Sequence, residues 1–188
     1  MRLSQRALVE TTVPEGASEL DRARRGDLDA FAGLIRTHQS GVYGLALRML
    51  GSPEEAQELA QDVFLQLHAG LARIESADHL RFWLRRTVSH RAIDRLRRRK
   101  QATARAEVLY EEPAMEDGGD LLLERRLREL VMELPAAPRA VVLLRYQEDL
   151  DPTEIARVLS LPLNTVKSHL KRSLALLRQR CEPIYEVE

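Results

Sequence analysis

Repeated helix stop-and-restart signals constrain this chain more than any other feature. Residues 51–55, Gly-Ser-Pro-Glu-Glu, combine a glycine suited to a left-handed helix end with a capping serine, a first-turn proline and the glutamate of a capping box. Residues 151–154, Asp-Pro-Thr-Glu, repeat the restart signal. Before the first of these signals, apolar residues recur at spacings of three and four, as at Phe31, Leu34 and Ile35. We therefore predict an all-α fold.

Length and composition favour two small helical domains over one large core. The chain has 188 residues, of which only 4% are aromatic and 31% are charged. Residues 103–119 are rich in Ala and Glu and contain Pro113 and Gly118-Gly119, which is typical of a linker. We predict an N-terminal extension over 1–17, a first domain over 18–102, a flexible acidic linker over 103–119, a second domain over 120–182 and a tail over 183–188.

Capping residues and prolines place the individual helices. In the first domain we expect helices to begin at Ser18, Asp27 and Ser52, followed by a loop over 73–79 and a long helix over about 80–100. In the second domain we expect helices over about 120–134, from Pro138 to about 147, over about 152–159, and from the cap Asn164 to about 181.

Charge is strongly segregated although the formal net charge is zero, with 29 basic and 29 acidic residues. Residues 85–100 carry eight Lys or Arg against the single acid Asp94, and 165–180 carry five without any acid. Between them, 107–124 carry seven acids and no base. This pattern indicates a nucleic-acid binder with two contact surfaces. The acidic segment could shield those surfaces, occupy a channel of a partner, or act as a solubilising spacer.

Several function classes are disfavoured. Cys181 is the single cysteine, which excludes an intrachain disulfide, and no stretch approaches the ~20 apolar residues of a membrane span. The histidines are dispersed, and no phosphate-binding glycine loop or nucleophile elbow is present. We expect a cytoplasmic protein without membrane insertion, catalytic activity, metal or cofactor.

Residues 154–171 have helix-turn-helix spacing. Ile155, Ala156 and Leu159 would form the buried face of a short helix, and about three residues join it to a longer one. The longer helix would bury Val166, Leu170, Leu174 and Leu177 and present a basic face to DNA. The candidate contacts are Thr165, Lys167, Ser168, His169, Lys171 and Arg172. The alternative is an ordinary solvated basic helix face.

Residues 134–178, LPAAPRAVVLLRYQEDLDPTEIARVLSLPLNTVKSHLKRSLALLR, resemble region 4 of sigma-70 family proteins, which binds the promoter −35 element. The resemblance rests on Leu134-Pro135, Arg139, Glu148, Glu154-Ile155-Ala156 and Thr165-Val166-Lys167-Ser168. His169 replaces a common Arg, and Ser160 stands in the turn where Gly is frequent. A non-Gly residue there must adopt the turn geometry at a modest cost.

The first domain is also similar to this family. Residues 52–67, SPEEAQELAQDVFLQL, resemble region 2.2, which implies a polymerase-binding face at Glu58, Gln61, Asp62 and Leu65. Residues 82–100, FWLRRTVSHRAIDRLRRRK, resemble regions 2.3 and 2.4, which melt and read the −10 element. The implied −10 contacts are His79, Arg86, His90, Arg91, Arg95, Arg98 and Arg99. The resemblance also implies that the loop over 73–79 binds a flipped-out base. From the residues alone, a solvated helix face is the favoured interpretation of the acids on 54–62, and the resemblance reverses this for Gln61 and Asp62.

The resemblance implies an extracytoplasmic-function (ECF) sigma factor, since no third domain fits in the linker. Its implied partners are core RNA polymerase, through the clamp helices of the largest subunit and the flap of the second, then promoter DNA and an anti-sigma protein. Two alternatives remain at this point. A conventional helix-turn-helix regulator would bind DNA without polymerase, and a nucleic-acid enzyme would need clustered carboxylates or a metal site.

Overall fold

The computed structural model describes residues 18–103 and 120–181, and every regular element in these ranges is helical, as predicted. The elements are α1 (Glu19–Arg24), α2 (Leu28–Leu50), α3 (Pro53–Gly70), the 3-10 turn η1 (Leu71–Arg73), α4 (Ala77–Thr103), α5 (Asp120–Glu133), α6 (Ala136–Tyr146), α7 (Pro152–Leu159) and α8 (Leu163–Cys181). The predicted N-terminal extension, the C-terminal tail and all of the predicted flexible acidic linker except Thr103 lie outside the described residues.

Helices begin at the capping residues that the sequence predicts. Three N-cap side chains accept a first-turn backbone N–H at 3.0–3.2 Å: Ser18, Asp27 and Ser52. At α7, Asp151 accepts the Glu154 N–H, and the Glu154 carboxylate accepts the Asp151 N–H, which completes a capping box. Gly51 ends α2 at a φ of 78°, a left-handed conformation that glycine adopts without steric cost.

Three boundaries differ from the prediction. The loop over 73–79 is shorter, because Ser76 accepts the His79 N–H at 3.1 Å and α4 already begins at the residue after Ser76. Helix α6 begins two residues before Pro138. Proline is tolerated in this first turn because the N–H groups there have no acceptor within the helix. Helix α8 begins one residue before Asn164, and the Pro162 carbonyl rather than the Asn164 side chain receives the first N–H, at 2.9 Å.

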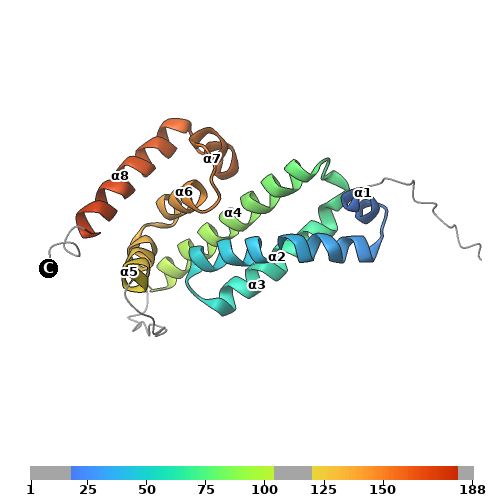
Figure 1. The fold of residues 1–188 in the computed structure, drawn as a ribbon, viewed down its shortest axis with the longest axis horizontal. Helices are drawn as coiled ribbons and strands as arrows, with labels where there is room; N and C mark the ends of the chain where they lie inside the picture. Colours follow the sequence, from blue (N-terminus) through green and yellow to red (C-terminus); the bar gives the residue numbers. More distant parts are fainter. Residues whose placement is uncertain (1–17, 104–119, 182–188) are drawn as a thin grey trace, which may run out of the picture.

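The N-terminal bundle, residues 18–103, is built around α2, α3 and α4, with α1 packed on α2 (Figure 1). Apolar residues at spacings of three and four fill its core, including the completely buried Ala46, Met49, Ala56, Leu59, Val63, Val88 and Ala92. The small alanines allow the helices to approach closely. As a result α3 and α4 lie next to each other, with their polar faces on a common edge.

The C-terminal bundle, residues 120–181, wraps α5, α7 and α8 around the buried helix α6. Ser160 joins α7 to α8 in a left-handed conformation, with φ 53° and ψ 43°. Glycine, which is frequent at this turn, adopts this conformation at a lower cost. The Leu161 N–H then donates to the Ala156 carbonyl at 3.0 Å, which closes the end of α7. This turn sets the relative orientation of the two helices of the helix-turn-helix.

The two bundles pack against each other, with α4 lying between α2 and α3 on one side and α6 and α7 on the other (Figure 1). Buried apolar side chains form one continuous core across the contact. Arg139 is buried there and donates to the carbonyls of Met49 at 2.6 Å, Leu134 at 3.1 Å and Met132. Burial, and to a lesser extent the charge of Arg99, lowers the pKa of the Arg139 guanidinium to about 10, so it remains protonated at neutral pH.

Candidate nucleic-acid and polymerase interfaces

Helix α8 lies at the edge of the molecule (Figure 1), and most of its predicted DNA-contacting residues are exposed. We call this set the α8 basic face: Thr165, Lys167, Ser168, His169, Lys171 and Arg172. Lys167, Lys171 and Arg172 are exposed, as is Ser168, whereas Thr165 and His169 are half-buried. The face therefore offers ammonium, guanidinium and hydroxyl donors on one accessible helix, which suits phosphate oxygens and base edges.

The opposite side of α8 anchors the helix on its own bundle. Val166 and Leu177 are buried as predicted, with 0% and 6% of their surface exposed. Leu170 and Leu174 are half-buried, whereas Ser173, which the sequence analysis did not assign to the core, is only 3% exposed. Helix α8 also packs against α5, α6 and α7, so its basic face is held on a rigid support.

The predicted −10 residues do not form one uniform surface. His79 lies in the first turn of α4, where its Nδ1 accepts the Glu75 N–H at 3.3 Å. Arg98 is exposed on the last turns of the helix. The remaining five residues already have partners within the molecule. Arg86 and His90 contact α7, and the other three contact α3: Arg91, Arg95 and Arg99.

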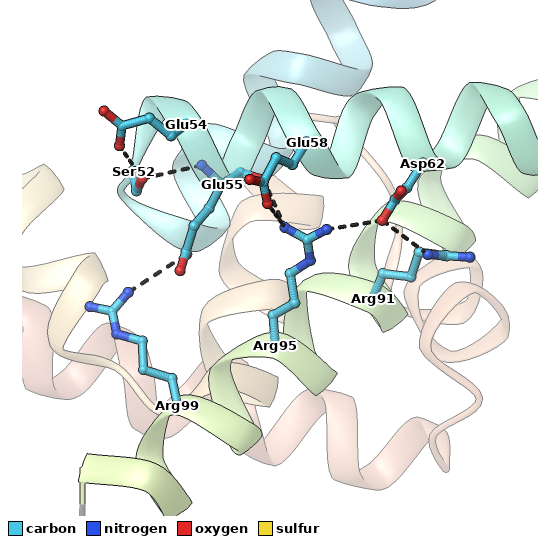
Figure 2. A network of polar contacts seen from close by, with 8 residues as sticks. All are labelled: Ser52, Glu54, Glu55, Glu58, Asp62, Arg91, Arg95 and Arg99. Carbon is cyan, nitrogen blue, oxygen red and sulfur yellow. Dashed lines mark hydrogen bonds and ion pairs between the residues drawn. The ribbon is translucent and has the colours of Figure 1, made fainter. Parts of the chain in front are cut away.

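Figure 2 shows how α3 and α4 are joined by charged pairs, which we call the α3–α4 ladder. Its members are Glu55, Glu58, Asp62 and Gln66 on α3 and Arg91, Arg95 and Arg99 on α4. Asp62 contacts two of these arginines, at 3.0 Å from Arg95 and 3.4 Å from Arg91. Members on each helix are spaced by three or four residues, so the same helical periodicity places them on facing edges.

Other contacts extend the ladder. Arg95 also donates to the Glu55 backbone carbonyl at 3.1 Å and reaches the Glu58 carboxylate at 3.4 Å. The Glu55 carboxylate extends toward Arg99, 3.8 Å away (Figure 2). Among the hydrogen bonds of the described residues, only the Ser52 half of the capping box predicted at α3 is formed. Gln66 accepts two hydrogen bonds from Arg91, at 2.8 and 3.1 Å.

The predicted polymerase-binding residues therefore fall into two groups. Glu58 and Asp62 belong to the ladder, whereas Gln61 and Leu65 are exposed, with 64% of Leu65 accessible. An apolar side chain exposed to this extent, beside a polar amide and acids, suits a protein contact. The acids and arginines that the sequence analysis assigned to different partners thus neutralise each other in the free chain.

Sequence reasoning missed the polar contacts between the bundles. Glu148, which follows α6, is 16% exposed and pairs with Arg85 at 2.8 Å and Arg48 at 3.8 Å. Both arginines belong to the N-terminal bundle. Glu148 and Arg139 entered the sequence analysis only as parts of the family pattern, and periodicity along one helix carries no signal for a pair separated by 63 residues.

Two features are absent from the described residues. Within 18–103 and 120–181, no three His, Cys, Asp or Glu side chains gather in a way that could hold a metal ion. None of the helices in these ranges combines the length and apolar character that a membrane crossing requires.

Comparisons with known proteins place this architecture in one class, the two-region sigma factors. Residues 34–102 match the family description "Sigma-70 region 2" and residues 124–177 match "Sigma-70, region 4". The chain is 27% identical to the ECF RNA polymerase sigma factor SigW of Bacillus subtilis, over 86% of this chain and 94% of SigW. It is 31% identical to the ECF RNA polymerase sigma factor SigK of Mycobacterium tuberculosis, over 89% of this chain and 96% of SigK.

The fold is also similar to a solved structure. The sigma factor RpoE of Bartonella quintana, in its complex with the anti-sigma factor NepR, superposes with a TM-score of 0.64 at 18% identity. The match covers 79% of this chain and 94% of RpoE. The chain belongs to the sigma-70 family as an ECF sigma factor with regions 2 and 4. It is not an enzyme, and it directs transcription initiation by RNA polymerase.

Proposed function

We propose that this sigma factor reads a −35 element with the α8 basic face and a −10 element with α4, while α3 docks on core polymerase. The observation that carries the −35 assignment is the exposure of Lys167, Lys171 and Arg172 on a helix whose other side is buried. Residues near the start of such a helix reach base edges in the major groove, and later ones meet phosphates. Arg172 would contact phosphate. Four residues would contact base edges or lie close to them: Lys167, Ser168, His169 and Lys171.

The proposed −10 site is the α4 surface with its seven predicted residues, from His79 to Arg99. Arg86 and His90 would contact the opened strand near the centre of the helix, and Arg98 would contact phosphate from its exposed position. Extruding a base requires a prepared pocket. We place it at the short turn before α4, over residues 74–76, because His79 belongs to the helix itself.

The proposed polymerase contact is the α3 face that contains Glu58, Gln61, Asp62 and Leu65, with the clamp helices of the largest subunit as its partner. The C-terminal bundle would meet the flap of the second subunit. This division assigns 18–102 to polymerase docking and −10 melting, and 120–182 to −35 recognition. Because two tethered contacts act together, each can be modest. The protein would act in the cytoplasm, where polymerase and promoter DNA meet.

We also propose regulation by an anti-sigma protein. The support is the fold shared with RpoE of Bartonella quintana, which was solved in complex with the anti-sigma factor NepR. Such a partner would cover the polymerase-binding surfaces, and an excess of it should suppress transcription by the assembled holoenzyme.

Run-off transcription with core polymerase on genomic fragments tests the proposal. The assembled holoenzyme should initiate at discrete sites that core enzyme alone does not use. Footprinting of those sites should show protection at −35 that is lost with Lys167→Ala. Absence of any specific initiation, or a −35 footprint by the free chain equal to that of the holoenzyme, would contradict the proposed division of labour.

A further inference from the structure

The turn before α4 contains a variant of the capping box. The Ser76 hydroxyl accepts the His79 N–H at 3.1 Å, which is the serine half of such a box. In the usual box, a glutamate or glutamine three residues after the cap accepts a backbone N–H in return. Here that position is occupied by His79, and its Nδ1 accepts the N–H of Glu75, one residue before the cap, at 3.3 Å. A histidine therefore takes the acceptor role at the edge of the proposed base pocket.

This hydrogen bond fixes the middle residue of the turn over 74–76. Ile74, at the start of the turn, is only 2% exposed, and its N–H donates to the Leu71 carbonyl at 3.0 Å. Helix α1 packs against η1, which directly precedes the turn. The next N–H along the chain is that of Glu75, which donates to His79. The ring of His79 thus continues the support of the turn from the core to the start of α4.

The bond to Glu75 also determines which ring nitrogen of His79 carries the proton. A neutral imidazole has one donor nitrogen and one acceptor nitrogen. Because Nδ1 accepts the Glu75 N–H, the proton of the neutral ring is on Nε2. Nε2 has no partner among the described residues, and the His79 side chain is half-buried. His79 therefore presents one oriented N–H donor beside the turn.

Such a donor suits the edge of a base. An ionised glutamate in this position would place a negative charge beside a polyanion and would have no proton to donate. Phosphate oxygens bind cations more strongly than neutral donors, and α4 offers cations such as the exposed Arg98. A neutral N–H held in one orientation matches a ring nitrogen or carbonyl oxygen of a base and not an exocyclic amino group.

We propose that His79 has two roles in the −10 site. Its Nδ1 positions the turn over 74–76, and its Nε2–H donates to an acceptor atom on the edge of the flipped-out base. This inference rests on the proposed function, because the base pocket at this turn is taken from there. Glu75 is then a positioning residue, and it acts through its backbone N–H.

The positioning role is tested on the full-length free chain by hydrogen exchange of the Glu75 amide. A hydrogen bond of ordinary net strength should slow this exchange by about twofold to tenfold relative to His79→Ala. His68→Ala is the matched control, because it removes an imidazole that packs on Phe31 instead of on the turn. It should leave the exchange of the Glu75 amide unchanged. Equal exchange in the wild type and in His79→Ala would overturn the positioning role, whether or not the holoenzyme initiates transcription.

The base contact is tested with the holoenzyme and a fluorescent non-template strand from a promoter at which it initiates. His79→Asn keeps an acceptor near the position of Nδ1 and removes the donor at Nε2. It should bind the intact strand about twofold to tenfold more weakly than the wild type, whereas His68→Asn should not. Each −10 base is then replaced in turn by an abasic site. At one position the difference between His79→Asn and the wild type should disappear. A difference that persists at every abasic position would overturn the base contact and indicate a phosphate contact instead.

A proline at position 75 separates the two roles. Glu75→Pro and Glu75→Ala both remove the side chain, and only proline removes the N–H that His79 accepts. The preceding residue tolerates the change, since Ile74 is extended with φ −85° and ψ 115°. Glu75→Pro should bind the strand about twofold to tenfold more weakly than Glu75→Ala, and the difference should disappear at the same abasic position. Equal binding by these two variants would overturn the link between the turn and the base contact.

Discussion

The Arg95 guanidinium lies 3.0 Å from the Asp62 carboxylate, which joins a residue of the proposed −10 site to a residue of the proposed polymerase face. Arg91 shares the same carboxylate oxygen at 3.4 Å. The two proposed surfaces are therefore electrostatically connected before either partner arrives. A residue that serves both will change polymerase binding and strand binding together.

Asp62→Asn should increase binding of single-stranded DNA by the free chain, because Arg91 and Arg95 lose the carboxylate that they share. We expect a gain of about twofold to fivefold, since part-exposed ion pairs are weak. Two newly available phosphate contacts should steepen the plot of log affinity against log salt concentration by about 1.4. Fluorescence anisotropy across a salt series measures both quantities.

The control is Glu54→Gln, which removes the same charge from the same helix at a residue that accepts from the Ser52 hydroxyl. The affinity of this variant for single-stranded DNA should rise only slightly. Its slope of log affinity against log salt concentration should match that of the wild type. If Asp62→Asn behaves identically, or merely lowers the melting temperature, the ladder is only a structural tie between α3 and α4.

Lys167→Ala should weaken −35 recognition without affecting polymerase binding. Loss of a base-edge contact costs about 1–3 kcal/mol, which corresponds to about a fivefold to 150-fold loss of promoter affinity. His169→Ala should act in the same direction. The measurements are holoenzyme binding to promoter DNA and, separately, sigma binding to core enzyme. Arg24→Ala removes one charge from α1, far from α8, and serves as the reference (Figure 1). Equal loss of both activities would contradict the assignment.

Ser160→Gly should stabilise the protein. Ser160 has a φ of 53°, and a left-handed backbone costs an L-residue about 1–2 kcal/mol, of which the greater unfolded-state freedom of glycine cancels part. The expected net gain is about 0.5–1 kcal/mol, or a rise in melting temperature of about 2–4 °C. Ser40→Gly, on the exposed face of α2, makes the same chemical change in a helix and should destabilise by about 0.5 kcal/mol. Two shifts of the same sign would refute the strain at Ser160.

Asp27→Asn should lower stability near neutral pH and lose its effect in acid. Hydrogen bonds from the Ala30 N–H and Arg22 lower the pKa of the Asp27 carboxyl. A lowered carboxyl pKa stabilises the fold above the unfolded value of about 3.9, and this contribution is lost as pH falls through the folded value. Asparagine keeps the capping oxygen and removes the charge. Melting temperatures of the two proteins should differ at about pH 7 and approach each other as pH falls below about 3.9 and through the lower folded-state pKa. A difference that persists in acid would show that the carboxyl charge is not responsible.

Local signals predicted much of the fold. Helix ends are governed by contacts within a few residues, so they can be predicted directly from the sequence. This holds for the caps at Ser18, Asp27, Ser52 and Asp151 and for the glycine at 51. The buried side of α8 followed from spacing, although Ser173 was missed because a serine gives no apolar signal. The start of α4 was misplaced because Ser76 was not identified as its cap.

Contacts between distant segments could not be predicted in the same way. The partner of Asp62 lies 33 residues away and that of Glu148 lies 63 residues away, and both pairings depend on how whole helices pack. The charge blocks along the chain indicated where basic surfaces would form. They did not reveal that the acids of α3 neutralise part of one, or that α7 covers another part.

Arg139 holds three backbone carbonyls, two from its own bundle and one from Met49. If the bundles part, only the Met49 carbonyl must exchange its donor for water, and the guanidinium retains the other two acceptors. The bundle that carries α8 thus keeps these internal hydrogen bonds in any complex that it joins. At Arg139, detachment hydrates only the Met49 carbonyl and leaves the hydrogen bonds inside the bundle that carries α8 in place.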